Sequence, residues 1–276
     1  MYKLSLLLIV IGLSAFLSST VNAFELGKND PNWLPQQVDF TGSYLYAHDK
    51  GYVQIPSGGK PGTSSIERPT LQELGINQSH DFDTTVQLDW SRFLVYAGYQ
   101  RIRPSGQSVL TNSLTTHGIN IPQNTPTSTD LIFDWYRAGL GYQFAYADNK
   151  IRLTPKVEEI MWHFDYRIST PSVSTMRHFN HLAPRVGLEG EWFIFPVLEA
   201  DLFYATSIAK QLNITTTYAK MIYYPWHNEK ISTGIFLGIG ETLINFKDNQ
   251  PLANHVHDLQ DPVLFAGVKL SLGNIR

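Results

Sequence analysis

Apolar and polar residues alternate along most of this chain with a period of two. Between positions 82 and 90, Phe82, Val86 and Trp90 fall on one side, while Asp83 and Gln87 fall on the other. Because successive side chains of a β-strand point to opposite faces, this pattern predicts a strand with one apolar and one polar face. Ten segments show the pattern, and we predict strands at residues 38–46, 82–90, 93–102, 131–146, 151–168, 182–194, 198–205, 214–224, 231–246 and 264–272.

The connections between these predicted strands alternate between long and short. A membrane-spanning up-and-down barrel has short turns at one end and long loops at the other, whereas a soluble sandwich has no reason to keep that order. The predicted fold class is therefore all-β, a single antiparallel up-and-down transmembrane β-barrel of about ten strands, with eight or twelve strands as alternatives. The long connections are residues 48–81, 103–130, 169–181, 206–213 and 247–261, and the short ones are 91–92, 147–150, 195–197 and 225–230.

Residues 1–23 have the order of parts found in an export signal. A single cation at Lys3 precedes an apolar run over residues 4–17 and a small-residue exit that ends at Ala23. An uncleaved helical anchor would need about 20 apolar residues and a basic flank, but an acidic residue follows almost directly. We therefore expect cleavage after Ala23, and one outer-membrane barrel domain over residues 24–276.

These features resemble those of Gram-negative outer-membrane β-barrel proteins. The resemblance is carried by the signal, the alternation, the loop lengths and the closing strand from Val263 to Leu272, and it covers nearly all of residues 24–276. It concerns architecture, and no named functional family comes with it. It implies an integral protein of the cell outer membrane, surrounded by lipid and lipopolysaccharide, inserted by the barrel-assembly machinery and monomeric.

Composition removes several other classes of protein. The chain is 16% charged with a formal net charge of −3, so no basic patch for nucleic acid is predicted. It has no Cys, which excludes a disulfide scaffold. No HExxH, GxSxG, Walker A or Gly-rich dinucleotide motif occurs. We expect neither a cofactor nor a nucleic-acid partner, and the external ligand stays open.

The polar face of the predicted strands carries charges of both signs. In a barrel of about ten strands the interior is narrow enough for side chains to fill, so we expect an ion-paired network in the lumen. The alternation breaks at Glu158 and Glu159, where we predict a β-bulge. The predicted lumen network comprises Arg137, Arg152, Lys156, Glu158, Asp165, Arg167, Arg185, Glu189, Glu191, Glu199, Asp201, Lys220, Glu241 and Lys269.

Two groups of residues are weak candidates for chemistry. His163 and Asp165 stand two apart on one strand, a spacing that suits a general base oriented by a carboxylate. The same pair serves equally well in the charge network, and we predict no catalytic site. His255 and His257 lie in the last long connection and are candidate metal ligands, with His178 and His181 as further contributors. Since histidines in loops commonly bind no metal, we expect none.

The sequence therefore predicts a non-enzymatic surface or envelope protein. Two alternatives stay open, a narrow channel for small solutes and a barrel hydrolase that acts on lipid A or on peptides. In the first long connection, Thr70 to Gly75 is predicted to form one capped helical turn. In the second, residues 109–110 and 119–121 are predicted to pair as a hairpin.

Overall fold

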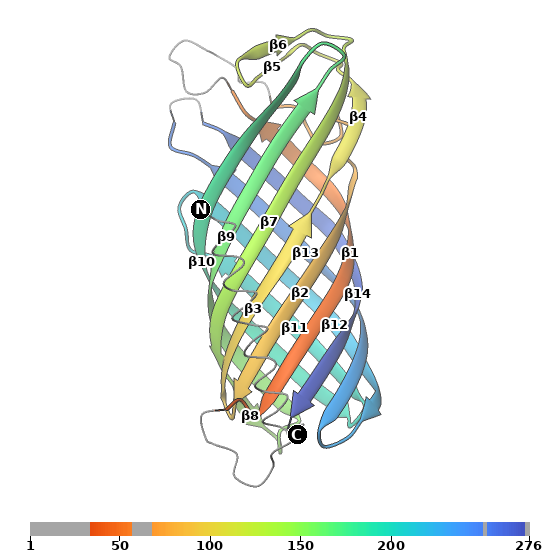
Figure 1. Ribbon diagram of the computed structural model, residues 1–276, viewed down its shortest axis with the longest axis vertical. Helices are drawn as coiled ribbons and strands as arrows, with labels where there is room; N and C mark the ends of the chain where they lie inside the picture. The colour runs from red at the N-terminus through yellow and green to blue at the C-terminus, as the bar shows by residue number, and fades with distance from the viewer. Residues whose placement is uncertain (1–33, 57–67, 251–252, 274–276) are drawn as a thin grey trace.

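The chain folds into a closed antiparallel β-barrel of ten strands (Figure 1). The computed structural model describes residues 34–56, 68–250 and 253–273. Every strand of the ring pairs with its sequence neighbour in the ring, and the last strand pairs with the first, so no edge is left open. The ring consists of β1 (Gln37–Gln54), β2 (Gln78–Trp90), β3 (Phe93–Ile102), β7 (Pro126–Tyr142), β9 (Ile151–Ser169), β10 (Ser174–Phe195), β11 (Leu198–Ser207), β12 (Leu212–His227), β13 (Ile231–Lys247) and β14 (His255–Gly273).

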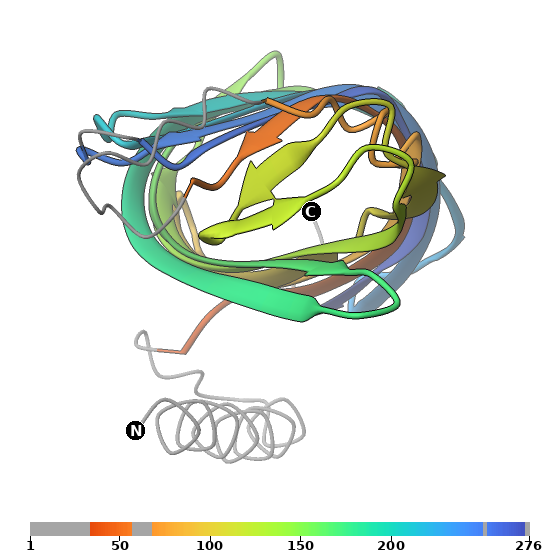
Figure 2. The ribbon, with the colours of Figure 1, turned by 90° about the horizontal axis from the view of Figure 1, so that it is seen from above.

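Four short strands supplement the ring. β4 (Ser105–Val109) pairs with the start of β7, and β8 (Phe144–Tyr146) pairs with the start of β9. β5 (Leu114–Thr116) and β6 (Ile119–Ile121) form a separate hairpin, which Figure 2 shows lying across the opening of the barrel. The hairpin prediction is thus corrected, because residues 119–121 pair with residues 114–116, and Val109 pairs with β7 instead.

All ten predicted strands are confirmed, and most are longer than the sequence pattern indicated. Most of the additional residues lie at the end with the long connections, called the loop end here; the opposite end is the turn end. There β1 continues to Gln54, and β10 begins at Ser174. The predicted signal peptide at residues 1–23 lies outside the described residues. Among the described residues, no helix is long and apolar enough to cross a membrane.

An apolar band surrounds the outside of the barrel. The most exposed outward residues of this band include Leu202 at 65% and Leu237 at 69%. A soluble protein of one chain rarely exposes so large a continuous apolar surface, whereas a membrane barrel requires one. Outward residues of the band include Leu140, Val157, Leu182, Leu188, Leu202, Met221, Ile235, Leu237, Leu264 and Val268.

Strand β9 shows where this band ends. From Ile151 to Val157 the outward residues are apolar, and the inward side carries Arg152, Lys156 and Glu158. Beyond that level the two faces exchange character. The inward residues become Ile160, Trp162, Phe164, Tyr166 and Ile168, all buried, and the outward ones include Glu159, His163, Asp165 and Arg167.

The exchange has a simple physical reason. An outer face in contact with hydrocarbon must be apolar, and an outer face in contact with water is polar where a protein core fills the inside. The predicted bulge at Glu158 and Glu159 is wrong, because β9 pairs with both neighbours through these residues without a register shift. Glu159 simply points outward at the level where the apolar band ends.

A hydrophobic core fills the loop end of the barrel. Its inward residues come from eight ring strands, and the first long connection adds a turn over it. In that turn the Glu73 amide donates to Thr70 Oγ1 at 3.1 Å, and the Thr70 amide donates to Glu73 Oε2 at 2.8 Å, the reciprocal pattern of a capping box. Gly75 ends it with a φ of +77°, as predicted. The core, called the cap here, includes Leu71, Leu74, Ile76, Leu114, Ile121, Phe133, Trp135, Trp162, Phe164, Ile244 and Phe246.

Candidate functional site

The lumen below the cap holds ion pairs between directly opposed residues of neighbouring strands. Arg185 lies opposite Glu158, and Arg185 Nε donates to Glu158 Oε1. Lys220 lies opposite Asp201, with 2.9 Å between Nζ and Oδ2. Arg152 lies opposite Glu191, with 3.9 Å between Nη1 and Oε2. Because paired positions of an antiparallel sheet share one face, strand register alone brings these charges together.

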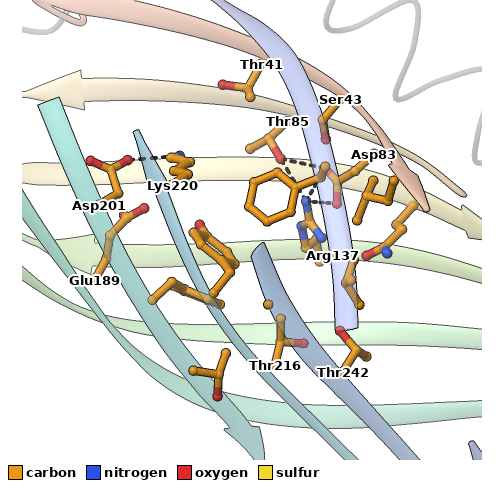
Figure 3. Close-up of a pocket in the computed structure, with 18 of the residues that line it drawn as sticks. Thr41, Ser43, Asp83, Thr85, Arg137, Glu189, Asp201, Thr216, Lys220 and Thr242 are labelled. Atoms are coloured by element: carbon orange, nitrogen blue, oxygen red, sulfur yellow. Dashed lines mark hydrogen bonds and ion pairs between the residues drawn. The ribbon is translucent and has the colours of Figure 1, made fainter. Parts of the chain in front are cut away.

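Other ion pairs join residues that are not directly opposed in the strand pairing. Arg137 on β7 donates through Nη2 to Asp83 Oδ1 at 2.6 Å and to Thr85 Oγ1 at 2.8 Å, both on β2 (Figure 3). Lys156 pairs with Glu189. Lys269 on β14 lies 3.6 Å from Asp39 Oδ2 and 4.0 Å from Glu199 Oε1.

Each cation that the structure places in this network therefore has an acidic partner. Aromatic rings complete their surroundings, since Lys156 Nζ lies 4.9 Å from the centre of the Tyr96 ring and Lys220 Nζ lies 5.5 Å from that of Phe236. Charges taken out of water are tolerated only when they are paired and hydrogen-bonded. The network thus braces the barrel wall and leaves little charge free for a solute.

A cavity of about 180 Å³ remains between these side chains. Pockets that hold drug-sized ligands are larger, about 300 to 1,000 Å³, so this cavity fits waters or a small ion. Trp135 belongs both to its lining and to the cap. The cap therefore contributes to the wall of the cavity through Trp135.

The structure brings most of the predicted lumen residues together. Asp165 and Arg167 are corrected, because the exchange of faces along β9 puts both on the outer wall. Glu241 sits at a β-bulge in β13; it is exposed but also borders the cavity. The predicted residues that line the cavity are Arg137, Lys156, Glu158, Arg185, Glu189, Glu191, Asp201, Lys220, Glu241 and Lys269, with Arg152 and Glu199 in ion pairs beside it.

Sequence reasoning missed two acidic partners in this network. Asp83 falls on the polar face of its predicted strand, but neither Asp83 nor Asp39 is among the predicted lumen residues, since their partners Arg137 and Lys269 are remote in sequence. Assigning alternate residues of β1 and β2 to the inner and outer face would have placed both aspartates inside. Asp39 and Asp83 stand next to Phe40 and Phe82, which point outward.

A second group of acids, also unpredicted, lies inside the barrel above the apolar band. Asp49, Asp81 and Asp258 come from β1, β2 and β14 and are at most 2% exposed. Burial, opposed by hydrogen bonds from Gln260 and Ser79, raises the pKa of Asp49 to about 6. Burial and the neighbouring carboxyls raise the pKa of Asp258 well above its usual range, and its oxygens have no hydrogen-bond partner among the described residues.

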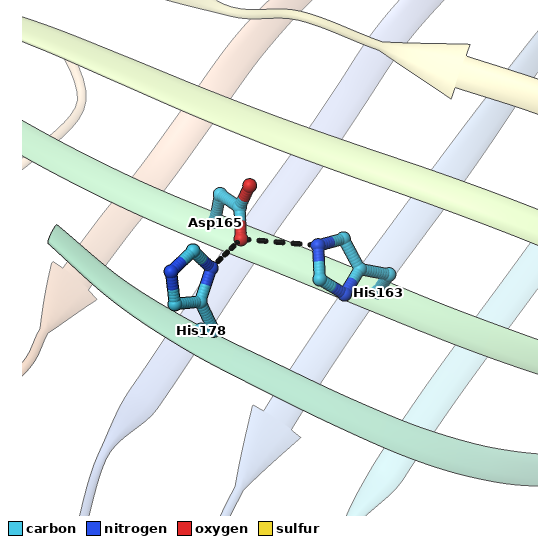
Figure 4. A group of neighbouring side chains, drawn as sticks. All are labelled: His163, Asp165 and His178. Atoms are coloured by element: carbon cyan, nitrogen blue, oxygen red, sulfur yellow. Dashed lines mark hydrogen bonds and ion pairs between the residues drawn. The ribbon is translucent and has the colours of Figure 1, made fainter. Parts of the chain in front are cut away.

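The predicted pair His163 and Asp165 lies on the outer wall, with His178 from β10 beside it (Figure 4). His163 Nε2 is 3.1 Å from Asp165 Oδ1, and His178 Nδ1 contacts the same oxygen. None of the three lines the cavity. No Ser, Thr or Cys hydroxyl or thiol is hydrogen-bonded to either imidazole in the described residues, so the arrangement lacks the nucleophile and base pair of covalent catalysis.

His255 and His257 do not join His178 or His181. Both contact Tyr52 of β1: the His255 ring meets it edge-on with ring centres 5.0 Å apart, and the His257 ring stacks on it at 5.5 Å. β14 and β10 are separated by three strands of the ring, so the predicted combination of loop histidines does not form. His181 instead packs on Phe246 in the cap.

Asp134 marks the end of the apolar band on β7. It accepts hydrogen bonds from Arg101 at 2.6 Å and Tyr99 at 2.7 Å. Burial acts against ionisation, but these hydrogen bonds hold the pKa of Asp134 below its usual value. This outward cluster therefore carries a stable ion pair where the outer wall changes from apolar to polar.

No protein-family model and no curated protein matches the chain. Solved structures with a similar fold include Ail, the attachment invasion locus protein of Yersinia pestis, at 10% identity over 85% of this chain and 99% of that one, TM-score 0.38. The outer membrane protease OmpT of Escherichia coli has 10% identity over 86% and 97%, TM-score 0.44. OprG of Pseudomonas aeruginosa, an outer membrane protein, has 11% identity over 88% and 99%, TM-score 0.35. These similarities to solved structures assign the chain no family and no activity.

Proposed function

We propose that this chain is an integral β-barrel protein of the Gram-negative outer membrane that serves as a surface or envelope component with a closed lumen. The observation that carries the proposal is the combination of an apolar outer band with a cap of buried side chains at the loop end. The band fits lipid and lipopolysaccharide as surroundings, with insertion by the barrel-assembly machinery. The loop end then faces outward from the cell.

Two features favour a closed barrel over a channel. Trp135, Trp162 and Phe164 are each at most 1% exposed and fill the inside of the ring above the cavity. Below them, the cations Arg185 and Lys220 are occupied by opposed acids. A pore needs a continuous wet path, and a ten-stranded barrel has space for side chains to block it.

The hydrolase alternative has less support. An enzyme at the loop end needs a nucleophile or an activated water held beside a general base. His163 and Asp165 contact each other and His178 on the outer wall, away from the cavity. The proposed role is therefore non-enzymatic, with the loop end as the contact surface for an external ligand.

Planar-bilayer recording of the purified protein tests the closed lumen. We expect no discrete conductance steps from the natural chain. A variant in which residues 111–124 are replaced by a Gly-Ser linker removes Leu114 and Ile121 from the cap, and adding Trp162→Ala enlarges the gap. If the cap is what closes the lumen, the barrel that carries both changes should conduct ions.

A control keeps that experiment interpretable. Leu202→Ala changes an outward residue of the band, and it should stay silent. Folding of every variant is checked by heat-dependent mobility on gels. Discrete steps from the natural chain, abolished by blocking substitutions at Arg137, would establish a channel and end the closed-lumen proposal.

A further inference from the structure

Four side chains form a compact block on the outer wall of β9 and β10. Asp165 lies directly opposite His178 in the strand pairing, and His163 lies directly opposite Asn180. All four belong to one face of the sheet because their positions alternate with buried inward residues. The ligand atoms of His163, Asp165 and His178 lie within 4.8 Å of one another.

Both ring nitrogens of His163 face oxygen atoms. Nδ1 is 2.5 Å from Asn180 Oδ1, and Nε2 is 3.1 Å from Asp165 Oδ1. A neutral imidazole carries one N–H and one lone pair. When Nδ1 donates to the Asn180 carbonyl, the lone pair of Nε2 points at the Asp165 carboxylate oxygen, and the two electron-rich atoms repel each other. A cation bound between Nε2 and this oxygen would be attracted by both atoms.

The spacing of these atoms suits a metal ion. Zinc binds imidazole nitrogen and carboxylate oxygen at about 2.0 to 2.2 Å, so tetrahedral ligand atoms stand roughly 3.3 Å apart. The Nε2 to Oδ1 distance of 3.1 Å is already close to that separation. A small rotation of the His178 ring would bring its nitrogen to the same separation and complete a set of three metal ligands.

The surroundings leave the group accessible. The side chains of His163, Asp165 and His178 are 33%, 19% and 52% exposed. Neighbouring charged side chains do not occupy the three ligands. Asp134 accepts a hydrogen bond from Arg101, and Arg167 donates to Met176. The site lies beyond the apolar band, in contact with water.

We propose that His163, Asp165 and His178 bind a divalent transition-metal ion, zinc by the character of the ligands, on the water-facing outer wall of the barrel. Three protein ligands leave a fourth position for water or for an external donor. Asn180 orients His163 through its second ring nitrogen, the role that hydrogen-bond acceptors commonly play behind a metal-bound imidazole. The ion would join β9 to β10 where this hairpin projects from the membrane.

Calorimetric titration of zinc into the purified full-length chain, freed of metal with a chelator, tests the proposal. We expect one site per chain in the natural protein. His163→Ala and His178→Ala should each weaken binding at least tenfold, and Asn180→Ala should weaken it about tenfold. Asp165→Asn should also weaken binding, because it removes the anionic ligand.

His48→Ala provides the matched control. His48 is an exposed histidine on the outer wall of β1, distant in the ring from β9, and its loss should leave zinc binding unchanged. Cobalt substitution supplies a second readout, since a tetrahedral cobalt spectrum should appear in the natural chain and disappear in His163→Ala. Heat-dependent gel mobility confirms that each variant is folded.

Three outcomes would overturn the site. The first is equal zinc affinity of the natural chain and of a folded His163→Ala, His178→Ala double variant. The second is an equal loss of affinity in His48→Ala, which would show general binding to surface histidines. The third is no binding by the natural chain at any zinc concentration that keeps it soluble.

Discussion

Arg185 and Glu158 form the most deeply buried ion pair of the described residues, with side chains only 3% and 4% exposed. They face each other across β10 and β9 at the level where the lumen meets the cap. Glu158 also accepts from the Tyr96 hydroxyl at 3.0 Å, and Arg185 donates to Thr216 at 3.1 Å. Four strands of the barrel therefore converge on one pair of charges.

Removing one member of this pair should be costly. Arg185→Met leaves Glu158 buried without its cation, and we expect a loss of about 3 to 5 kcal/mol in the free energy of unfolding. The double variant Arg185→Met, Glu158→Leu removes both charges and should recover most of that loss. Urea unfolding of the protein in lipid vesicles, followed by tryptophan fluorescence, measures both. Equal destabilisation of the single and double variants would contradict this account of the pair.

The exchange of faces along β9 predicts opposite outcomes at two nearby positions. Phe164 is fully buried in the cap, whereas Met161 points outward and is 37% exposed. Phe164→Ala should cost about 3 to 5 kcal/mol because it opens a cavity in a packed core. Met161→Ala should cost far less in the same unfolding assay. A larger effect at Met161 would reverse the assignment of the two faces.

The apolar band makes a separate prediction. Leu237→Lys puts a charge on the outward face of β13 and should cost about 2 to 4 kcal/mol if the position lies near the middle of the bilayer. His48→Lys, on the outer wall above the band, should cost about 0 to 1 kcal/mol. Unfolding in vesicles compares the two, and similar penalties would argue against lipid contact at Leu237.

The buried acids predict that stability depends on pH. The pKa of Asp49 is about 6 in the folded chain and near 3.8 in an ordinary setting, so the folded state binds more protons between these values. Stability contributed by this group is therefore fully present below about pH 4 and falls as pH rises through about 6. The raised pKa values of Asp81 and Asp258 act in the same direction.

Asp49→Asn tests this dependence, because the amide cannot ionise and still accepts hydrogen bonds from Ser79 and Gln260. It should stabilise the barrel at pH 8 by about 1 to 3 kcal/mol and change it little at pH 4. His48 and His80 also act on Asp49, so the natural chain and the variant are compared at each pH. A constant difference between them across this range would rule out ionisation of Asp49 as the cause.

The sequence determined the closed ten-stranded barrel because alternation of period two and alternating loop lengths are properties of neighbouring residues. It also indicated the lumen charges on the strand segments within the apolar band, such as Glu189 and Lys220. The alternation of apolar and polar residues along one strand is a local property of the sequence. Hydrocarbon outside the barrel requires it directly, because every outward residue in contact with it must be apolar.

Only the tertiary structure decided which solvent each end of a long strand meets. Asp165 was expected inside and lies outside, because β9 leaves the membrane near Glu159 and its inner face then meets a protein core. Tyr166 and Tyr224 both point inward, where the Tyr224 hydroxyl donates to Glu199 Oε2 at 2.6 Å. The pairing of His178 with Asp165 and of Asp83 with Arg137 likewise depends on strand register and ring closure, which no local pattern of residues encodes.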